Sequence, residues 1–214
     1  MRSDYADAIL AKLDLMRKSS SSSLLSTTSK SVGAVSSLNN NAVIAKRNRT
    51  IDVSHFWDEK PEENQANLRN AVSALLSSLK SNYSVQAKTV SVGSAFGRTH
   101  LNVGYLEALM NSRIVVVAQR DGWEDHYRFF EGLVGGALVM TDPMWTLPEG
   151  FVDGENVIVY KSLEHLTQLI QQYLDPSNHS KRIDIAMRGW ELAMSRYRTW
   201  HLMESVFFGR ILTP

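Results

Sequence analysis

The chain has 214 residues, of which 43% are hydrophobic and 21% charged, and its net charge is +1. This composition is that of a globular protein with enough apolar side chains for a core, in one or two domains. A charge so close to zero does not point to a nucleic-acid partner. The absence of cysteine excludes disulfides, a thiol nucleophile and thiolate metal sites.

No apolar run approaches the roughly 18 residues that a membrane-spanning helix needs. A secretory signal also needs an apolar segment near its start, where this chain carries charged residues, namely Arg2, Asp4, Asp7 and Lys12. We therefore expect a cytoplasmic protein, or a Golgi or endomembrane protein if a longer parent chain carries a signal anchor.

The first 48 residues differ in composition from the rest. Apolar residues within 1–18 are spaced as on one face of a helix, and ten serines then fall within 19–37. Such a segment buries too little surface to become ordered, so we expect a disordered linker at 19–48. Up to Arg49 there are eight basic and three acidic residues, against 15 and 19 in the remainder, as in a basic tail attached to a domain. We interpret Lys46, Arg47 and Arg49 as a solvated flank of that tail.

From residue 49 to residue 214, strand and helix patterns alternate. Strands are predicted at 50–56, 85–93, 113–119, 137–141 and 157–160, and helices at about 61–79, 104–112, 126–136, 162–174, 176–196 and 198–208. Gly135 and Gly136 are expected to end one helix, and Asp175 with Pro176 to begin another. This alternation predicts an α/β fold with a Rossmann-like, doubly wound parallel sheet and helices at its C-terminal end.

A doubly wound sheet binds its ligand at the carboxyl ends of its strands. In this chain those ends are the loops after His55, Gly93, Gln119 and Thr141. These loops and the helix beside the third one hold the candidate donor-binding residues, which are Arg120, Gly122, Arg128, Glu131, Thr141 and Asp142.

Residues 128–142, with the sequence RFFEGLVGGALVMTD, resemble a pattern common in GT-B glycosyltransferases. That pattern is an arginine, an aromatic–glutamate pair, a small apolar run, a glycine and a strand. The chain is most similar to the spore-protein (CgeB-type) branch of the family 1-like glycosyltransferases, whose typical C-terminal tail resembles residues 151–201. The resemblance covers about 49–208, and the order and spacing of its pieces carry it.

The resemblance implies transfer of a sugar from a nucleotide-sugar to an unknown acceptor, without a bound metal, and implies that Glu131 binds the donor ribose. An ionised carboxylate suits a vicinal diol, although the alternative is a glutamate on an exposed helix surface. Arg128 lies on the same helix face, where it either clamps the donor pyrophosphate or pairs with Glu131. Arg120 either faces phosphate or is a solvated loop cation.

The sequence departs from the family pattern in two places. Many retaining relatives have a second glutamate eight residues before the ribose glutamate, but Trp123 stands there, with Glu124 and Asp125 nearest. Retaining and inverting chemistry therefore both stay open. The loop after the first strand, usually glycine-bearing in relatives, holds Phe56 and Trp57, which either stack on a base or belong to the core.

In GT-B enzymes the acceptor and any catalytic base come mainly from an N-terminal domain, which residues 1–46 cannot supply. We therefore expect this chain to bind a donor but to turn over little without such a domain or a partner chain. Two alternatives stay open: a non-catalytic nucleotide-sugar-binding module, and a structural α/β interaction domain.

Overall fold

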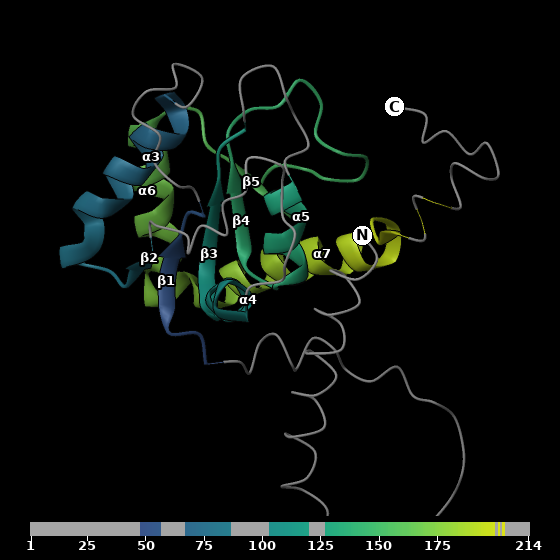
Figure 1. Ribbon diagram of the computed structural model, residues 1–214, viewed down its shortest axis with the longest axis horizontal. Coiled ribbons are helices and arrows are strands. Elements are labelled where there is room, and N and C mark those ends of the chain that lie inside the picture. The colour runs from purple at the N-terminus through teal and green to yellow at the C-terminus, as the bar shows by residue number, and fades with distance from the viewer. Residues whose placement is uncertain are drawn as a thin grey trace, which may run out of the picture.

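The computed structural model describes residues 48–56, 67–86, 103–119, 127–199, 201 and 203 (Figure 1). Its strands are β1 (Ile51–Ser54), β2 (Val85–Gln86), β3 (Ser112–Val117), β4 (Leu138–Thr141) and β5 (Ile158–Val159). Its helices are α3 (Asn67–Ser78), α4 (Val103–Asn111), α5 (Tyr127–Val134), α6 (Leu163–Leu174) and α7 (His179–Arg196), with 3-10 turns η2 (Leu79–Ser81) and η3 (Pro176–Asn178).

The five strands form one parallel sheet in the order β2-β1-β3-β4-β5. Side chains of the central strands alternate between two cores. Val115, Val117 and Val139 pack with α4 and α5, whereas Ile114 and Met140 pack on the opposite face with α3 and α6. In Figure 1, α3 and α6 lie to the left of the sheet and α5 to its right. The predicted doubly wound α/β fold is confirmed, and its strand order reverses between β1 and β3.

Local signals set several helix ends. Gly136 adopts a φ of 72°, and its N–H donates to Leu133 O at 2.8 Å, so α5 ends at the glycine pair as predicted. The predicted helix start, with Asp175 as the cap and Pro176 at the first position, is confirmed, although its first turn is 3-10 rather than α. The Asp175 carboxylate accepts from the Ser177 N–H at 2.8 Å, and this tight turn forms η3 before α7 begins at His179.

The interpretation of Arg49 as part of a solvated flank is wrong. Arg49 is 5% exposed, and its side chain donates to three main-chain carbonyls at the amino edge of the sheet. Nη1 donates to Met110 O at 3.0 Å and to Ser112 O at 2.7 Å, and Nη2 donates to Gly135 O at 2.9 Å. Arg49 therefore joins the start of the sheet to the ends of α4 and α5. Lys46 and Arg47 lie outside the described residues.

The predicted helix within 1–18, the linker up to residue 47 and most of the predicted 198–208 helix also lie outside the described residues. None of the described helices is long and apolar enough to span a bilayer.

Candidate donor site at the carboxyl edge of the sheet

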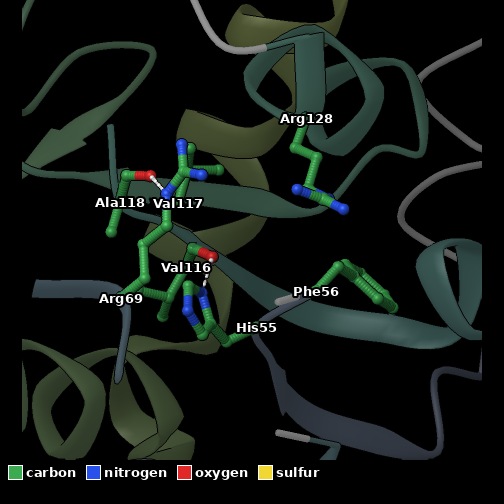
Figure 2. A pocket seen from close by; sticks show the side chains of 7 residues that line it. All are labelled: His55, Phe56, Arg69, Val116, Val117, Ala118 and Arg128. Carbon is green, nitrogen blue, oxygen red and sulfur yellow. Dashed lines mark hydrogen bonds between the residues drawn. The ribbon is translucent and has the colours of Figure 1, made fainter. Parts of the chain in front are cut away.

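A small recess of about 10 Å³ opens at the carboxyl edge, between the ends of β1 and β3. Its lining comes from the ends of both strands and from the first turns of α3 and α5, and consists of His55, Phe56, Arg69, Val116, Val117, Ala118 and Arg128 (Figure 2). This is the point where the strand order reverses, and doubly wound sheets bind their ligands there.

Two arginines enter the recess from two helices. Arg69 is 4% exposed, and its Nε donates to Ala118 O at 2.9 Å. Arg128 extends from the first turn of α5, with its guanidinium carbon 5.2 Å from the centre of the Tyr127 ring. Figure 2 shows its guanidinium pointing toward the space between Arg69 and Phe56. The first turns of α3 and α5, as far as the structure describes them from Asn67 and Tyr127, contain no acidic residue. Both cations lie at the carboxyl edge of the sheet, where two guanidiniums favour an anion.

Gly132 brings α5 close to the sheet. A side chain at this position would place its Cβ 2.9 Å from a Val139 methyl and 3.2 Å from a Val115 methyl. The absence of a side chain at Gly132 thus lets α5 pack directly on β3 and β4. This contact fixes where Arg128 and Glu131 stand relative to the recess.

His55 is buried directly beneath the recess. Its Nδ1 lies 2.9 Å from Val116 O, which holds the ring against β3. The pKa of His55 is lowered to about 4, chiefly by burial and also by the positive charges of Arg128 and Arg69, against the raising effect of nearby backbone carbonyls. His55 is therefore neutral near pH 7.

Glu131, the predicted ribose ligand, is 8% exposed and accepts a short hydrogen bond from the Tyr105 hydroxyl. The alternative of a glutamate on an exposed helix surface is therefore wrong. Tyr105 extends from α4, and its ring packs edge-on against Phe56 at 4.8 Å between centroids. Phe56 is 2% exposed, so of its two predicted roles the core contact is the one observed. Glu131 and Arg128 lie on the same helix, as predicted.

Thr141 and Asp142 join the ends of β3 and β4. The Asp142 Oδ1 accepts from the Gln119 N–H at 2.8 Å, and the Gln119 Nε2 donates to Thr141 Oγ1 at 3.2 Å. Burial raises the pKa of Asp142, although these hydrogen bonds oppose the shift. Both residues hold the carboxyl edge together, and neither lines the recess.

Arg120 and Gly122 lie outside the described residues, as do Trp57, Trp123, Glu124 and Asp125. Within the described ranges, no three His, Asp or Glu side chains gather closely enough to hold a metal ion.

The sequence interpretation missed Arg69 and gave His55 no role. Arg69 had a usable signal, because it occupies the same helical stripe as Val72 and Leu76, which are fully buried. An arginine in phase with a buried stripe must find polar partners. His55 had no comparable signal, since a single histidine after a strand is compatible with many surroundings.

A family model described as glycosyl transferase-like matches residues 69–207. No curated protein sequence matches the chain. Among solved structures, the C-terminal domain of the glycosyl transferase group 1 family protein LpcC from Francisella tularensis is 15% identical with a TM-score of 0.49, covering 69% of this chain and 87% of that one. Anabaena HepE in complex with UDP and glucose is 14% identical with a TM-score of 0.50, covering 85% of this chain and 53% of HepE. At these identities the likeness concerns the fold.

Proposed function

This chain belongs to the glycosyl transferase-like family, and from that premise we propose that it is the donor-binding half of a glycosyltransferase. It binds a nucleotide-sugar, whose sugar is transferred to an acceptor held by another domain or chain. The observation that carries the proposal is the pair of arginines, Arg69 and Arg128, in a recess at the β1/β3 switch point.

In the proposed site the two guanidiniums bind the donor pyrophosphate. A guanidinium presents a planar fork of N–H donors that matches phosphate oxygens. Negative charge grows on the leaving diphosphate as the glycosidic bond breaks, so fixed cations at this point stabilise the transition state. The amino ends of α3 and α5 contribute in the same direction.

Glu131 binds the ribose hydroxyls in this proposal, and Tyr105 orients its carboxylate. A carboxylate offers about four lone-pair positions, and the Tyr105 hydroxyl occupies one of them. A ribose hydroxyl donates to another. Because Glu131 is only 8% exposed, the side chains that cover it must move before a ribose can reach it.

The finer assignment rests on the sequence. The likeness of residues 128–142 to the CgeB-type branch supports that branch within the family. The chain spans 53% of the length of HepE, which was solved with UDP and glucose, so a uridine nucleotide is the first donor to test. The proposal includes an acceptor domain on this protein or on a partner chain, and the sugar transferred is a hexose or a pentose.

One observation favours the rival function, a structural α/β module without a ligand. The recess holds only about 10 Å³, far below the roughly 300–1,000 Å³ of most small-molecule pockets. A donor site must therefore open on binding. A structural module would keep Arg69 and Arg128 only as packing residues.

A calorimetric titration separates the two functions. UDP and UDP-glucose are titrated into the wild type and into Arg69→Gln, Arg128→Gln and Arg188→Gln, the last being an exposed arginine on α7 that serves as control. Losing a hydrogen bond to a charged group costs roughly 1.5–3 kcal/mol, so each recess variant should weaken UDP binding about 10- to 150-fold. Equal affinity in all four proteins, or no UDP binding together with normal folding, supports the structural module.

A further inference from the structure

The helix α7 carries an apolar stripe that belongs to neither core. Its buried face packs into the two cores through Ile185, Ala186 and Ala193. About a third of a turn round the helix lies a second set of side chains, at positions i, i+4, i+7 and i+11: Ile183, Met187, Trp190 and Met194. These four side chains, the α7 stripe, are half-buried, and neither of the two cores formed by described residues includes them.

The outward face of α7 differs sharply from this stripe. It consists of Asp184, Arg188, Glu191 and Ser195, and all four are exposed. A helix that meets only water on two sides carries polar residues on both, but the α7 stripe contains none. Methionine and tryptophan provide three of its four side chains, and both residue types are enriched where proteins contact a partner. The stripe therefore indicates a contact outside the two cores.

The chain enters the domain beside this stripe. Asn48, the first described residue, and Ile183 line the same recess at the amino edge of the sheet. The segment that precedes Asn48 is therefore attached next to the first side chain of the stripe. Within residues 1–18 the apolar positions have a similar spacing, i, i+4, i+8 and i+11: Tyr5, Ile9, Leu13 and Met16. On helices both stripes extend about 16 Å, so their lengths match.

The length of chain between the two stripes allows them to meet. A serine-rich coil as long as residues 19–47 spans about 30 Å on average, and the 18 residues of α7 extend about 27 Å. Tethering at this range gives an effective concentration on the order of mM, so a contact too weak between separate molecules forms within one chain. An isolated helix is marginal in water because most helical stability in proteins comes from packing of the apolar face.

We propose that residues 1–18 form an amphipathic helix that docks on the α7 stripe of the same chain. Each apolar face then covers the other. A second copy of the chain fits less well, since four half-buried side chains fall short of the roughly 800 Å² that each partner buries in a stable interface. The contact goes beyond the proposed function, because no residue of the stripe lines the donor recess.

Cysteine cross-linking tests this contact without background, because the chain has no cysteine of its own. One full-length variant combines Ile9→Cys with Met187→Cys in the stripe. The matched control combines Ile9→Cys with Arg188→Cys, the next residue, on the exposed face of α7. A short bifunctional thiol reagent is added, and mass spectrometry after proteolysis distinguishes links within one chain from links between chains. We expect the Met187 pair to link within one chain roughly tenfold faster than the control.

A further substitution separates docking from random encounter. Leu13→Asp, added to the Met187 pair, places a charge in the proposed contact and should lower the rate to that of the control. Ala11→Asp, on the opposite face of the segment, should not. Circular dichroism checks the folding of each variant, and Met194→Cys repeats the measurement one stripe position further along α7 if Met187→Cys disturbs the fold.

Other occupants of the stripe would give different links. Links mainly between two chains would show that a second copy covers it. A faster link from Met187→Cys to Val206→Cys than to Ile9→Cys would assign it to the C-terminal segment. Either result, equal rates for Met187→Cys and Arg188→Cys, or no effect of Leu13→Asp would overturn the proposal.

Discussion

The two edges of the sheet both gather arginines, but the helices meet them in opposite orientations. At the amino edge, Arg49 donates to carbonyls at the ends of α4 and α5, and Arg182 donates to Tyr173 O in the last turn of α6. At the carboxyl edge, Arg69 and Arg128 stand in the first turns of α3 and α5. The same residue type thus meets negative helix ends at one edge and positive helix ends at the other.

Helix direction therefore separates structural from functional cations. Each helix end carries about half an elementary charge, negative at the carboxyl terminus. Arg49 and Arg182 satisfy carbonyls that the fold would otherwise bury, so the native state needs them. Arg69 also donates to a main-chain carbonyl, Ala118 O, but in the proposed function it and Arg128 additionally bind an anionic ligand. In a parallel α/β sheet the carboxyl edge is accordingly where arginines indicate binding.

The largest expected effect is structural and lies at the amino edge. Arg49→Met removes three hydrogen bonds to main-chain carbonyls at the amino edge of the sheet. Each buried acceptor left without a donor costs roughly 1–3 kcal/mol, so the free energy of unfolding should fall by at least about 3 kcal/mol. Urea denaturation measures it. A loss below about 1 kcal/mol would mean that Arg49 is not the structural cation described here.

The second prediction concerns acid and the carboxyl edge. The pKa of His55 is about 4 in the folded chain against 6.5 for the free side chain. Between these values the unfolded state binds a proton that the folded state excludes, so stability is full above pH 6.5 and falls as the pH drops toward 4. The loss amounts to roughly 3 kcal/mol.

The control for this pH effect is His55→Asn, which retains an N–H donor for Val116 O but does not titrate. The unfolding free energy of His55→Asn should lack the decrease of roughly 3 kcal/mol between pH 6.5 and pH 4 that protonation of His55 causes in the wild type. Parallel profiles for the two proteins between pH 4 and 6.5 would refute the assignment to His55.

The third prediction concerns the donor site alone. Glu131→Gln keeps the side-chain shape but loses the charged acceptor, so UDP affinity should fall about 10- to 150-fold. Tyr105→Phe removes only the hydroxyl that orients Glu131, and a smaller loss of roughly tenfold or less is expected. Calorimetry on both variants checks this order. If Glu131→Gln lowers stability by several kcal/mol and leaves UDP affinity unchanged, Glu131 is a structural residue.

The smallest expected effect returns to the amino edge. The Arg113–Asp52 ion pair is partly exposed, with 39% and 18% of the two side chains accessible. Arg113→Gln should therefore lower the free energy of unfolding by less than about 1 kcal/mol. Urea denaturation of Arg113→Gln alongside Arg49→Met tests whether two arginines at the same edge of the sheet differ in their contribution to stability as they differ in burial. A loss as large as that of Arg49→Met would place Arg113 among the structural cations.

Much of the fold could be predicted because its signals are local. The apolar runs that form β3 and β4, and the glycine pair after α5, depend on residues that are neighbours in sequence. The Arg49 contacts could not be predicted in this way, since its carbonyl partners lie 61 to 86 residues away. A flanking cation and a buried one look the same until the chain is folded.

The candidate site was predictable in its place and only partly in its residues. Strand alternation placed the ligand at the carboxyl edge, and Arg128 lines the recess found there. Arg69 enters from a helix that follows a different strand, and the Tyr105–Glu131 contact joins α4 to α5. Both depend on how helices pack across the sheet, which periodicity within one segment does not specify.

The position of β1 in the sheet also sets an order for folding. It is the first described strand in sequence but lies between β2 and β3. The last hydrogen-bond partner of Arg49, which precedes β1, is Gly135 O, 86 residues later in the chain. At a synthesis rate of roughly 5–20 residues per second, about 4–17 s pass between the two. Until β3 has been synthesised, the hydrogen-bonding edge of β1 that later pairs with it is exposed, so nascent chains stalled before Ser112 should be the ones that chaperones bind and that aggregate.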